Sequence, residues 1–214
     1  MVNLTINGLP VSVEADATIL QAARKLGIKI PTLCHFELDC FEVEHRMGSC
    51  RVCVVEVEGR RNLAPACCTP VSEGMVVQSN SLRATQARRT VLDLILSDHP
   101  KECLTCPVNG NCELQELAGD MKLTKVVYEG EMSHYPMDVS SESIVRNLDK
   151  CIMCRRCETA CNDMQTVGIL SGVRRGFEVV VAPSLEKPLS ETKCVFCGQR
   201  SEEHTSELQS PNTI

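Results

Sequence analysis

The sequence predicts an α+β protein, and three observations lead to this fold class. Short stretches near the N-terminus alternate apolar and polar residues, as half-buried strands do. Two later stretches repeat their apolar residues every three or four positions, as amphipathic helices do. The cysteines gather in the loops between these predicted elements.

The composition is that of a globular protein. The chain has 214 residues, of which 43% are hydrophobic and 23% charged, and this length allows one or two compact domains. The formal net charge is −6 and only 3% of the residues are aromatic. Nucleic-acid binding is therefore not expected, because it depends on basic side chains for the phosphates and aromatic ones for the bases.

The first third of the chain predicts a small sheet with one helix. The expected elements, in order, are a strand over 2–6, a turn at Asn7-Gly8, a strand over 10–13, a helix over 19–26 and a strand over 51–57. Asp16 or Thr18 can cap the helix, and Gly27 ends it. We place the end of this domain near Asn80.

Two further helices and one strand are predicted beyond this point. A helix over 81–97 has an apolar stripe made of Ala84, Ala87, Val91, Leu94 and Ile95. Its arginines, expected outside that stripe, are Arg83, Arg88 and Arg89. A second helix covers 113–118 and ends at Gly119, the polar stretch 120–145 is expected to be a connecting segment, and an apolar strand covers 178–181.

Cysteine is the outlier in the composition. The chain has 15 cysteines, about 7% of its residues, which is well above average usage. The N-terminus lacks the basic and apolar regions of a signal peptide, and no apolar run reaches the length of a membrane span. We therefore expect a cytoplasmic protein, in which cysteines stay reduced and serve as metal ligands rather than forming disulfides.

The first cysteine set predicts a [2Fe–2S] cluster. Such a cluster needs four thiolates, and a loop with a C-x2-C pair and two outlying cysteines supplies them. The candidate ligands are Cys34, Cys50, Cys53 and Cys67. We choose Cys34 over Cys40 and Cys67 over Cys68, and Gly48 is expected to let the backbone approach the cluster closely.

The second set combines a histidine with three cysteines. Its members are His99, Cys103, Cys106 and Cys112. This donor set suits a [4Fe–4S] cluster, although zinc also binds three cysteines and one histidine. A neutral imidazole in place of a thiolate makes a cluster less anionic and shifts its potential upward.

The third and fourth sets predict ferredoxin-type [4Fe–4S] clusters. The bacterial ferredoxin run appears as Cys151, Cys154, Cys157 and Cys161, and a further pair follows at Cys194 and Cys197. In such runs the fourth cysteine ligates the neighbouring cluster. The first cluster would therefore use Cys151, Cys154 and Cys157, and the second would use Cys161, Cys194 and Cys197, which leaves each one ligand short.

The last residues, 200–214, are expected to be foreign to the native chain. The stretch from Arg200 to Ser210 resembles the translation of a widely used sequencing-library adapter. At the position where a third cysteine would complete the last motif, the sequence has Arg200. Native sequence is therefore expected to end near Gln199, inside that motif.

The order of the cysteine sets resembles the N-terminal electron-transfer region of three families. These are the [FeFe] hydrogenases, the large iron–sulfur subunit of respiratory NADH dehydrogenase and the NAD-dependent formate dehydrogenases. The segments 151–161, 165–170, 177–183 and 194–199 are most similar to the hydrogenases, and the resemblance covers residues 1–199. It implies a β-grasp ferredoxin domain over 1–80, a helical [4Fe–4S] module over 81–120, a connector over 121–140 and an incomplete two-cluster ferredoxin-like domain over 141–199.

The resemblance also implies a function. The parent chain would be an iron hydrogenase, and this part of it would carry electrons but no catalytic residue. Electrons would pass between ferredoxin, or NAD(H)-handling flavin and iron–sulfur subunits, and a hydrogen-activating domain that is missing here. The same relay attached to an NADH or formate dehydrogenase is one alternative.

One interpretation from a different class competes with the electron relay. A zinc-binding interaction module would explain the C-x2-C pairs but not the run of four cysteines over 151–161. No nucleotide-binding glycine motif is present. The paired arginines at 60–61, 88–89, 155–156 and 174–175 are expected on solvated faces or docking rims, and His35, His45 and His134 receive no role.

Overall fold

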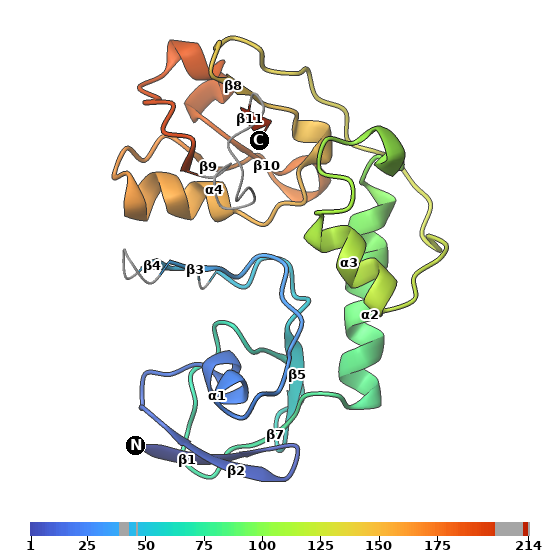
Figure 1. Cartoon of the computed structure of the whole chain (residues 1–214), viewed down its shortest axis with the longest axis vertical. Coiled ribbons are helices and arrows are strands. Elements are labelled where there is room, and N and C mark those ends of the chain that lie inside the picture. The colour runs from blue at the N-terminus through green and yellow to red at the C-terminus, as the bar shows by residue number, and fades with distance from the viewer. Residues whose placement is uncertain (39–42, 46, 200–211, 214) are drawn as a thin grey trace. The chain divides into compact units, whose positions relative to one another are not determined.

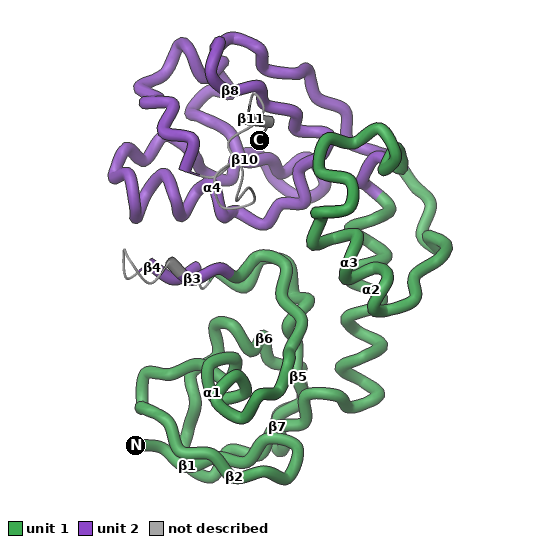
Figure 2. Tube along the Cα trace, in the orientation of Figure 1, with its two compact units in different colours: residues 1–35, 46–97, 101–130 green, residues 36–45, 98–100, 131–214 purple. Residues whose placement is uncertain are grey.

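The computed structural model describes residues 1–38, 43–45, 47–199 and 212–213 (Figure 1). The chain divides into two compact units (Figure 2). Unit 1 contains residues 1–35, 46–97 and 101–130, and unit 2 contains residues 36–45, 98–100 and 131–214. Within the described part of the chain, no helix is both long enough and apolar enough to span a bilayer.

Unit 1 is built on a five-stranded sheet with the strand order β2-β1-β7-β5-β6. The strands are β1 (Val2–Ile6), β2 (Leu9–Val13), β5 (Val54–Val57), β6 (Ala64–Pro65) and β7 (Val76–Gln78). Strand β1 pairs antiparallel with β2 and parallel with β7, while β5 pairs antiparallel with both β7 and β6. The predicted hairpin turn is confirmed, because Asn7 and Gly8 both have positive φ angles, 51° and 82°.

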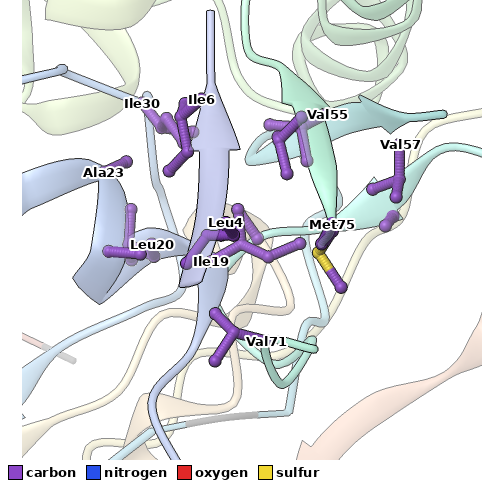
Figure 3. Packing of buried hydrophobic residues seen from close by; sticks show 14 of the residues in the cluster. Leu4, Ile6, Ile19, Leu20, Ala23, Ile30, Val55, Val57, Val71 and Met75 are labelled. Atoms are coloured by element: carbon purple, nitrogen blue, oxygen red, sulfur yellow. The ribbon is translucent and has the colours of Figure 1, made fainter. Parts of the chain in front are cut away.

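Helix α1 (Ile19–Lys25) packs on this sheet and completes the core. Thr18 caps it: its hydroxyl accepts a hydrogen bond from the Gln21 N–H, and the Gln21 side chain accepts one from the Thr18 N–H. Ile19 and Leu20 face Leu4 and Ile6 of β1 in a fully apolar cluster (Figure 3). Each such buried side chain stabilises the fold by about 1.5–3 kcal/mol.

Two helices follow the sheet in unit 1, α2 (Leu82–Ser97) and α3 (Glu113–Asp120), with a short 3-10 turn, η2 (Cys103–Thr105), between them. Both predicted helices are confirmed, and α3 runs slightly further than expected. The predicted apolar stripe of α2 is partly wrong. Leu94 is 49% exposed, and the buried line along the helix instead runs through Ala84, Arg88 and Leu92.

Unit 2 has short elements joined by long loops. Its paired strands are β3 (Glu37–Leu38) with β4 (Val43–Glu44), β9 (Ser171–Val173) with β10 (Val180–Ala182), and β8 (Ile144–Val145) with β11 (Asn212–Thr213). Helix α4 (Arg156–Thr159) continues into a π-helical turn, η4 (Ala160–Met164). Short 3-10 turns are η3 (Leu148–Lys150), η5 (Gly176–Glu178), η6 (Ser184–Glu186) and η7 (Leu189–Glu191). The strand predicted over 178–181 is found as β10, shifted by one to two residues.

Candidate metal centres

Four cysteine thiols meet inside unit 1. Cys34 follows α1, Cys50 and Cys53 flank the loop before β5, and Cys67 follows β6. All four side chains are buried, and the sulfurs of Cys53 and Cys67 are 3.4 Å apart. The Cys34 thiol is hydrogen-bonded to Cys50 and to Cys67. The structure thus brings together the four cysteines that the sequence singled out for a [2Fe–2S] site.

Without a bound metal, burial and mutual hydrogen bonds disfavour more than one thiolate among these four cysteines. Hydrogen bonds with Cys34, and then burial, raise the pKa of Cys50 far above that of a free thiol. Hydrogen bonds with Cys34 and Cys53, and then burial, raise the pKa of Cys67 in the same direction. In contrast, the hydrogen bond with Cys67 lowers the pKa of Cys53 to about 7. A buried set of this kind fits a metal cluster, whose cationic iron offsets the additional thiolates.

The two spare cysteines of this region differ from the four. Cys68 is only half-buried, and its sulfur lies 3.8 Å from the Pro65 carbonyl oxygen. Gly48 has a φ of +59°, and a Cβ added there would lie 2.9 Å from the Cys68 sulfur. The glycine therefore makes room for Cys68. Cys40 lies outside the residues that the structure describes.

Three C-x2-C loops share one N–H to sulfur contact. The N–H two residues after the first cysteine donates to that cysteine's sulfur: Val52 to Cys50 at 3.4 Å, Met153 to Cys151 at 3.4 Å, and Phe196 to Cys194. Each loop also contains one residue with a left-handed backbone, and these are Arg51, Met153 and Phe196. Main-chain N–H groups aimed at a sulfur favour its thiolate form, which is the form that binds metal.

The three cysteines of the second set lie on neighbouring turns of unit 1. Cys103 opens η2, the N–H of Cys106 donates to the Cys103 carbonyl oxygen at 3.1 Å, and Cys112 is the N-cap residue of α3. Cys103 is exposed, and the other two are half-buried.

The fourth member of that set, His99, is grouped with unit 2. Burial, and then the charge of Lys150, lower its pKa, so that its imidazole is held in the neutral, metal-binding form. Its Nδ1 is buried and has no hydrogen-bond partner among the described residues. The set that joins His99 to the three cysteines stays a prediction.

The ferredoxin-type cysteines all lie in unit 2. Cys154 is buried, Cys197 is exposed, and the other four are half-buried. Burial, and then the nearby thiols of Cys197 and Cys161, raise the pKa of Cys194. Cys161, the fourth cysteine of the run, therefore lies close to Cys194. This is expected if Cys161 ligates the same cluster as Cys194 and Cys197. Cys151 and Cys157 both lie near the guanidinium of Arg146.

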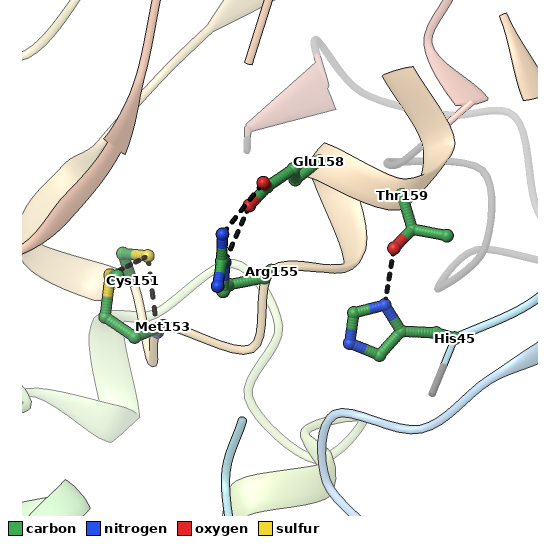
Figure 4. Close-up of polar contacts among 6 residues, drawn as sticks. All are labelled: His45, Cys151, Met153, Arg155, Glu158 and Thr159. Atoms are coloured by element: carbon green, nitrogen blue, oxygen red, sulfur yellow. Dashed lines mark hydrogen bonds and ion pairs between the residues drawn. The ribbon is translucent and has the colours of Figure 1, made fainter. Parts of the chain in front are cut away.

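Polar contacts stabilise helix α4, which contains Cys157 in its first turn (Figure 4). Arg155 forms a two-pronged ion pair with Glu158 at 2.6 and 2.8 Å. The Nδ1 of His45 lies 2.6 Å from the Thr159 hydroxyl oxygen, and the His45 ring stacks on Phe36 at 5.6 Å. Both side chains of the His45–Thr159 hydrogen bond are buried.

Sequence reasoning missed the buried arginines of these sites. Arg88 and Arg156, expected on solvated faces or docking rims, are each only 3% exposed. Arg146, which received no role, is 6% exposed and donates to the Val181 carbonyl oxygen. Arg60 and Arg61 are exposed as expected. The burial of Arg88 could have been predicted from the sequence, because Arg88 lies four residues from both Ala84 and Leu92 and so shares one helix face with them.

A small sheet with one helix, four converging buried thiols and repeated N–H to sulfur loops define an iron–sulfur protein. Residues 1–81 match the family described as a 2Fe-2S iron-sulfur cluster binding domain. Residues 88–126 match the iron-sulfur binding region of NADH-ubiquinone oxidoreductase-G. The chain therefore has one region for a [2Fe–2S] cluster and one for a [4Fe–4S] cluster, and the cofactor prediction is confirmed.

Longer relatives extend the likeness to nearly the whole chain. The chain is 58% identical over 200 residues to the HndD subunit of the NADP-reducing hydrogenase of Solidesulfovibrio fructosivorans, covering 93% of this chain and 34% of that relative. It is 34% identical over 206 residues to the NADH-quinone oxidoreductase G 2 subunit of Rhizobium meliloti strain 1021, covering 92% of this chain and 22% of that relative. It thus spans about a third and about a fifth of these proteins.

The fold of this chain is also similar to that of a solved hydrogenase structure. The crystal structure of an NAD+-reducing [NiFe]-hydrogenase in the H2-reduced state superposes with a TM-score of 0.80 at 26% identity. The match covers 91% of this chain and 80% of that one. The chain is an iron–sulfur electron-transfer region related to the G-type subunits of NADH-quinone oxidoreductase and to NADP-reducing hydrogenase.

Proposed function

We propose that this chain is the electron relay of an [FeFe] hydrogenase. Electrons would pass one at a time between a hydrogen-activating centre elsewhere in the parent protein and either ferredoxin or an NAD(H)-handling partner protein. The observation that carries the proposal is the convergence of four buried thiols in unit 1. The relative with 58% identity, named for a hydrogenase, supports the choice of parent enzyme.

The proposal includes the finer organisation of the chain. Residues 1–80 would form a β-grasp ferredoxin domain, in keeping with the order β2-β1-β7-β5-β6 and with the single helix α1. Residues 81–120 would form the helical [4Fe–4S] module. Residues 121–140 would connect it to an incomplete two-cluster ferredoxin-like domain over 141–199, followed by a non-native tail.

The proposed ligand sets follow the four cysteine constellations. An iron–sulfur cluster, when bound, takes up and releases single electrons. The chain's own residues hold the sulfurs in place, shield them from water and donate N–H groups to them. The proposed ligands are Cys34, Cys50, Cys53 and Cys67; His99, Cys103, Cys106 and Cys112; Cys151, Cys154 and Cys157; and Cys161, Cys194 and Cys197.

The second candidate is the same relay in an NADH-oxidising enzyme. The match of residues 88–126 to the NADH-ubiquinone oxidoreductase-G region favours it. All three relatives described above are named for nicotinamide nucleotides, which makes an NAD(P)H-handling partner part of either proposal. Hydrogen oxidation by the parent protein distinguishes the two, because only a hydrogenase parent reduces an acceptor with H2. We propose a cytoplasmic location for both.

Anaerobic reconstitution of the full chain with iron and sulfide tests the relay. We expect a brown protein whose dithionite-reduced form gives the paramagnetic spectra of a [2Fe–2S] and of at least one [4Fe–4S] cluster. A colourless product that contains zinc and lacks sulfide would reject the relay in favour of a zinc-binding module.

A further inference from the structure

Helix α2 lies beside β5 (Figure 1). Its Arg88 is a buried cation that contacts that strand. Its Nε and Nη2 donate to the Val54 carbonyl oxygen at 3.0 and 2.7 Å, and Nη2 also donates to the Ser79 carbonyl oxygen at 2.7 Å. Its Nη1 lies 3.4 Å from the Asn80 side-chain oxygen. All of these acceptors are neutral, so the hydrogen bonds position the guanidinium without cancelling its charge.

The charged group that favours the protonated form of Arg88 is Cys53, which is a candidate ligand. Burial lowers the pKa of Arg88, and the Cys53 thiolate is the charged group that raises it. Cys53 directly precedes Val54, whose carbonyl oxygen takes two of the guanidinium's hydrogen bonds. A buried charge without a counter-ion is strongly unfavourable, so a permanently charged arginine here needs a nearby negative group.

We propose that Arg88 is the counter-charge of the [2Fe–2S] site and that it raises the reduction potential of the cluster held there. This inference rests on the proposed ligand set of Cys34, Cys50, Cys53 and Cys67. Four thiolates leave the loaded site negative, and reduction adds one more electron to it. A fixed guanidinium in a low-dielectric interior stabilises the reduced state more than the oxidised state.

Charge and hydrogen bonding by Arg88 can be separated by substitution. Arg88→Gln removes the charge and keeps one donor for the carbonyl oxygens, whereas Arg88→Lys also loses the guanidinium fork but keeps the charge. Arg89→Gln is the matched control, because Arg89 is the adjacent residue, is exposed and loses the same charge. Asn80→Asp places a carboxylate beside the guanidinium and offsets its charge while Arg88 and its contacts to Val54 and Ser79 remain.

The experiment is an anaerobic redox titration of the reconstituted full chain, followed through the [2Fe–2S] paramagnetic signal. We expect Arg88→Gln and Asn80→Asp to shift the reduction equilibrium about tenfold toward the oxidised form, which is about 59 mV for a one-electron couple. Arg88→Lys and Arg89→Gln should stay close to the wild-type potential.

Several results would overturn the inference. Equal shifts in Arg88→Gln and Arg88→Lys would mean that Arg88 acts only through its hydrogen bonds. If Arg88→Gln does not assemble a cluster, Asn80→Asp decides, and an unshifted potential in that variant contradicts the proposed counter-charge. A wild-type chain without any [2Fe–2S] signal would instead overturn the proposed function.

Discussion

Cys67 and Cys68 are neighbours in sequence but have different surroundings. Cys67 is fully buried with its sulfur 3.4 Å from that of Cys53, whereas Cys68 is half-buried beside the Pro65 carbonyl oxygen. We predict that Cys67→Ser abolishes the [2Fe–2S] paramagnetic signal of the reconstituted chain, because a serine hydroxyl replaces a ligand thiolate. Cys68→Ser is the control and should leave the signal in place. Loss of the signal in Cys68→Ser alone would reverse the assignment.

The thiols of the same site also predict a pH dependence for the metal-free chain. The pKa values of Cys50 and Cys67 are raised in the folded state above the ordinary thiol value of 9.0. A group with a raised folded-state pKa stabilises the fold below its unfolded pKa and loses that contribution as the pH rises above it. The pKa of Cys53 is lowered to about 7, so its contribution to the unfolding free energy rises between about pH 7 and 9 and no longer changes above pH 9.

The free energy of unfolding of the metal-free chain should therefore fall when the pH rises from about 9 to about 10. Urea titrations under reducing conditions measure it. A variant with Cys50→Ala and Cys67→Ala is the control for other groups that titrate in this range, and its loss should be smaller. An equal loss in both chains would show that the two thiols are not responsible.

At the scale of elements, α1 links its own stability to the position of Cys67. The N–H groups of Ile19 and Leu20 donate to the carbonyl oxygens of Thr69 and Ala66, on either side of Cys67. We predict that Thr18→Ala, which removes the N-cap hydroxyl, lowers the unfolding free energy by about 0.5–2 kcal/mol. It should also weaken retention of the [2Fe–2S] cluster, measured as the rate of bleaching with a chelator. Thr18→Ser keeps the cap, so bleaching as fast as in Thr18→Ala would contradict the link.

Elements with a strong local pattern could be predicted from the sequence. The hairpin at Asn7-Gly8, the capped helix α1 and the long helix α2 each follow from neighbouring residues and are found in the structure. The short strand β9 carried no such signal, because Ser171 to Val173 includes a glycine and its pairing with β10 is a tertiary contact. The inward face of α2 was missed because an arginine on a helix ordinarily faces water, whereas Arg88 binds two main-chain carbonyl oxygens.

In the candidate sites, too, some residues are indicated by their spacing in the sequence, whereas other contacts depend on the tertiary structure. Spacing alone brought out Cys50 and Cys53, and the ferredoxin run from Cys151 onward. Cys34 and Cys67 were also chosen as their partners from the sequence, and the fold brings these distant cysteines to one place. The hydrogen bond between His45 and Thr159 joins residues 114 positions apart, and no pattern within either segment indicates it.

At the scale of the whole molecule, we expect the clusters to contribute much of the stability. Two of the four buried thiols of unit 1, Cys53 and Cys67, belong to its apolar core, and metal binding in small domains adds directly to the free energy of folding. We predict that Cys53→Ser abolishes the [2Fe–2S] cluster and loosens residues 1–80. Hydrogen exchange should be faster there than in the reconstituted wild type. Cys40→Ser serves as the control, and a protected N-terminal region with its cluster spectrum intact after Cys53→Ser would disprove the assignment.

In the three C-x2-C loops described above, the N–H to sulfur contact is made by the backbone and does not depend on which side chains stand between the cysteines. The middle pairs, Arg51-Val52, Ile152-Met153 and Val195-Phe196, have no side-chain chemistry in common. A left-handed backbone disfavours branching at Cβ, and Arg51, Met153 and Phe196 are all unbranched there. The exposed middle residues Arg51 and Val195 can therefore be changed, for solubility or for recognition of a redox partner, while the N–H to sulfur contact stays in place. Val52 and Met153 are different, because Val52 is fully buried and the Met153 sulfur lies 3.9 Å from that of Cys151.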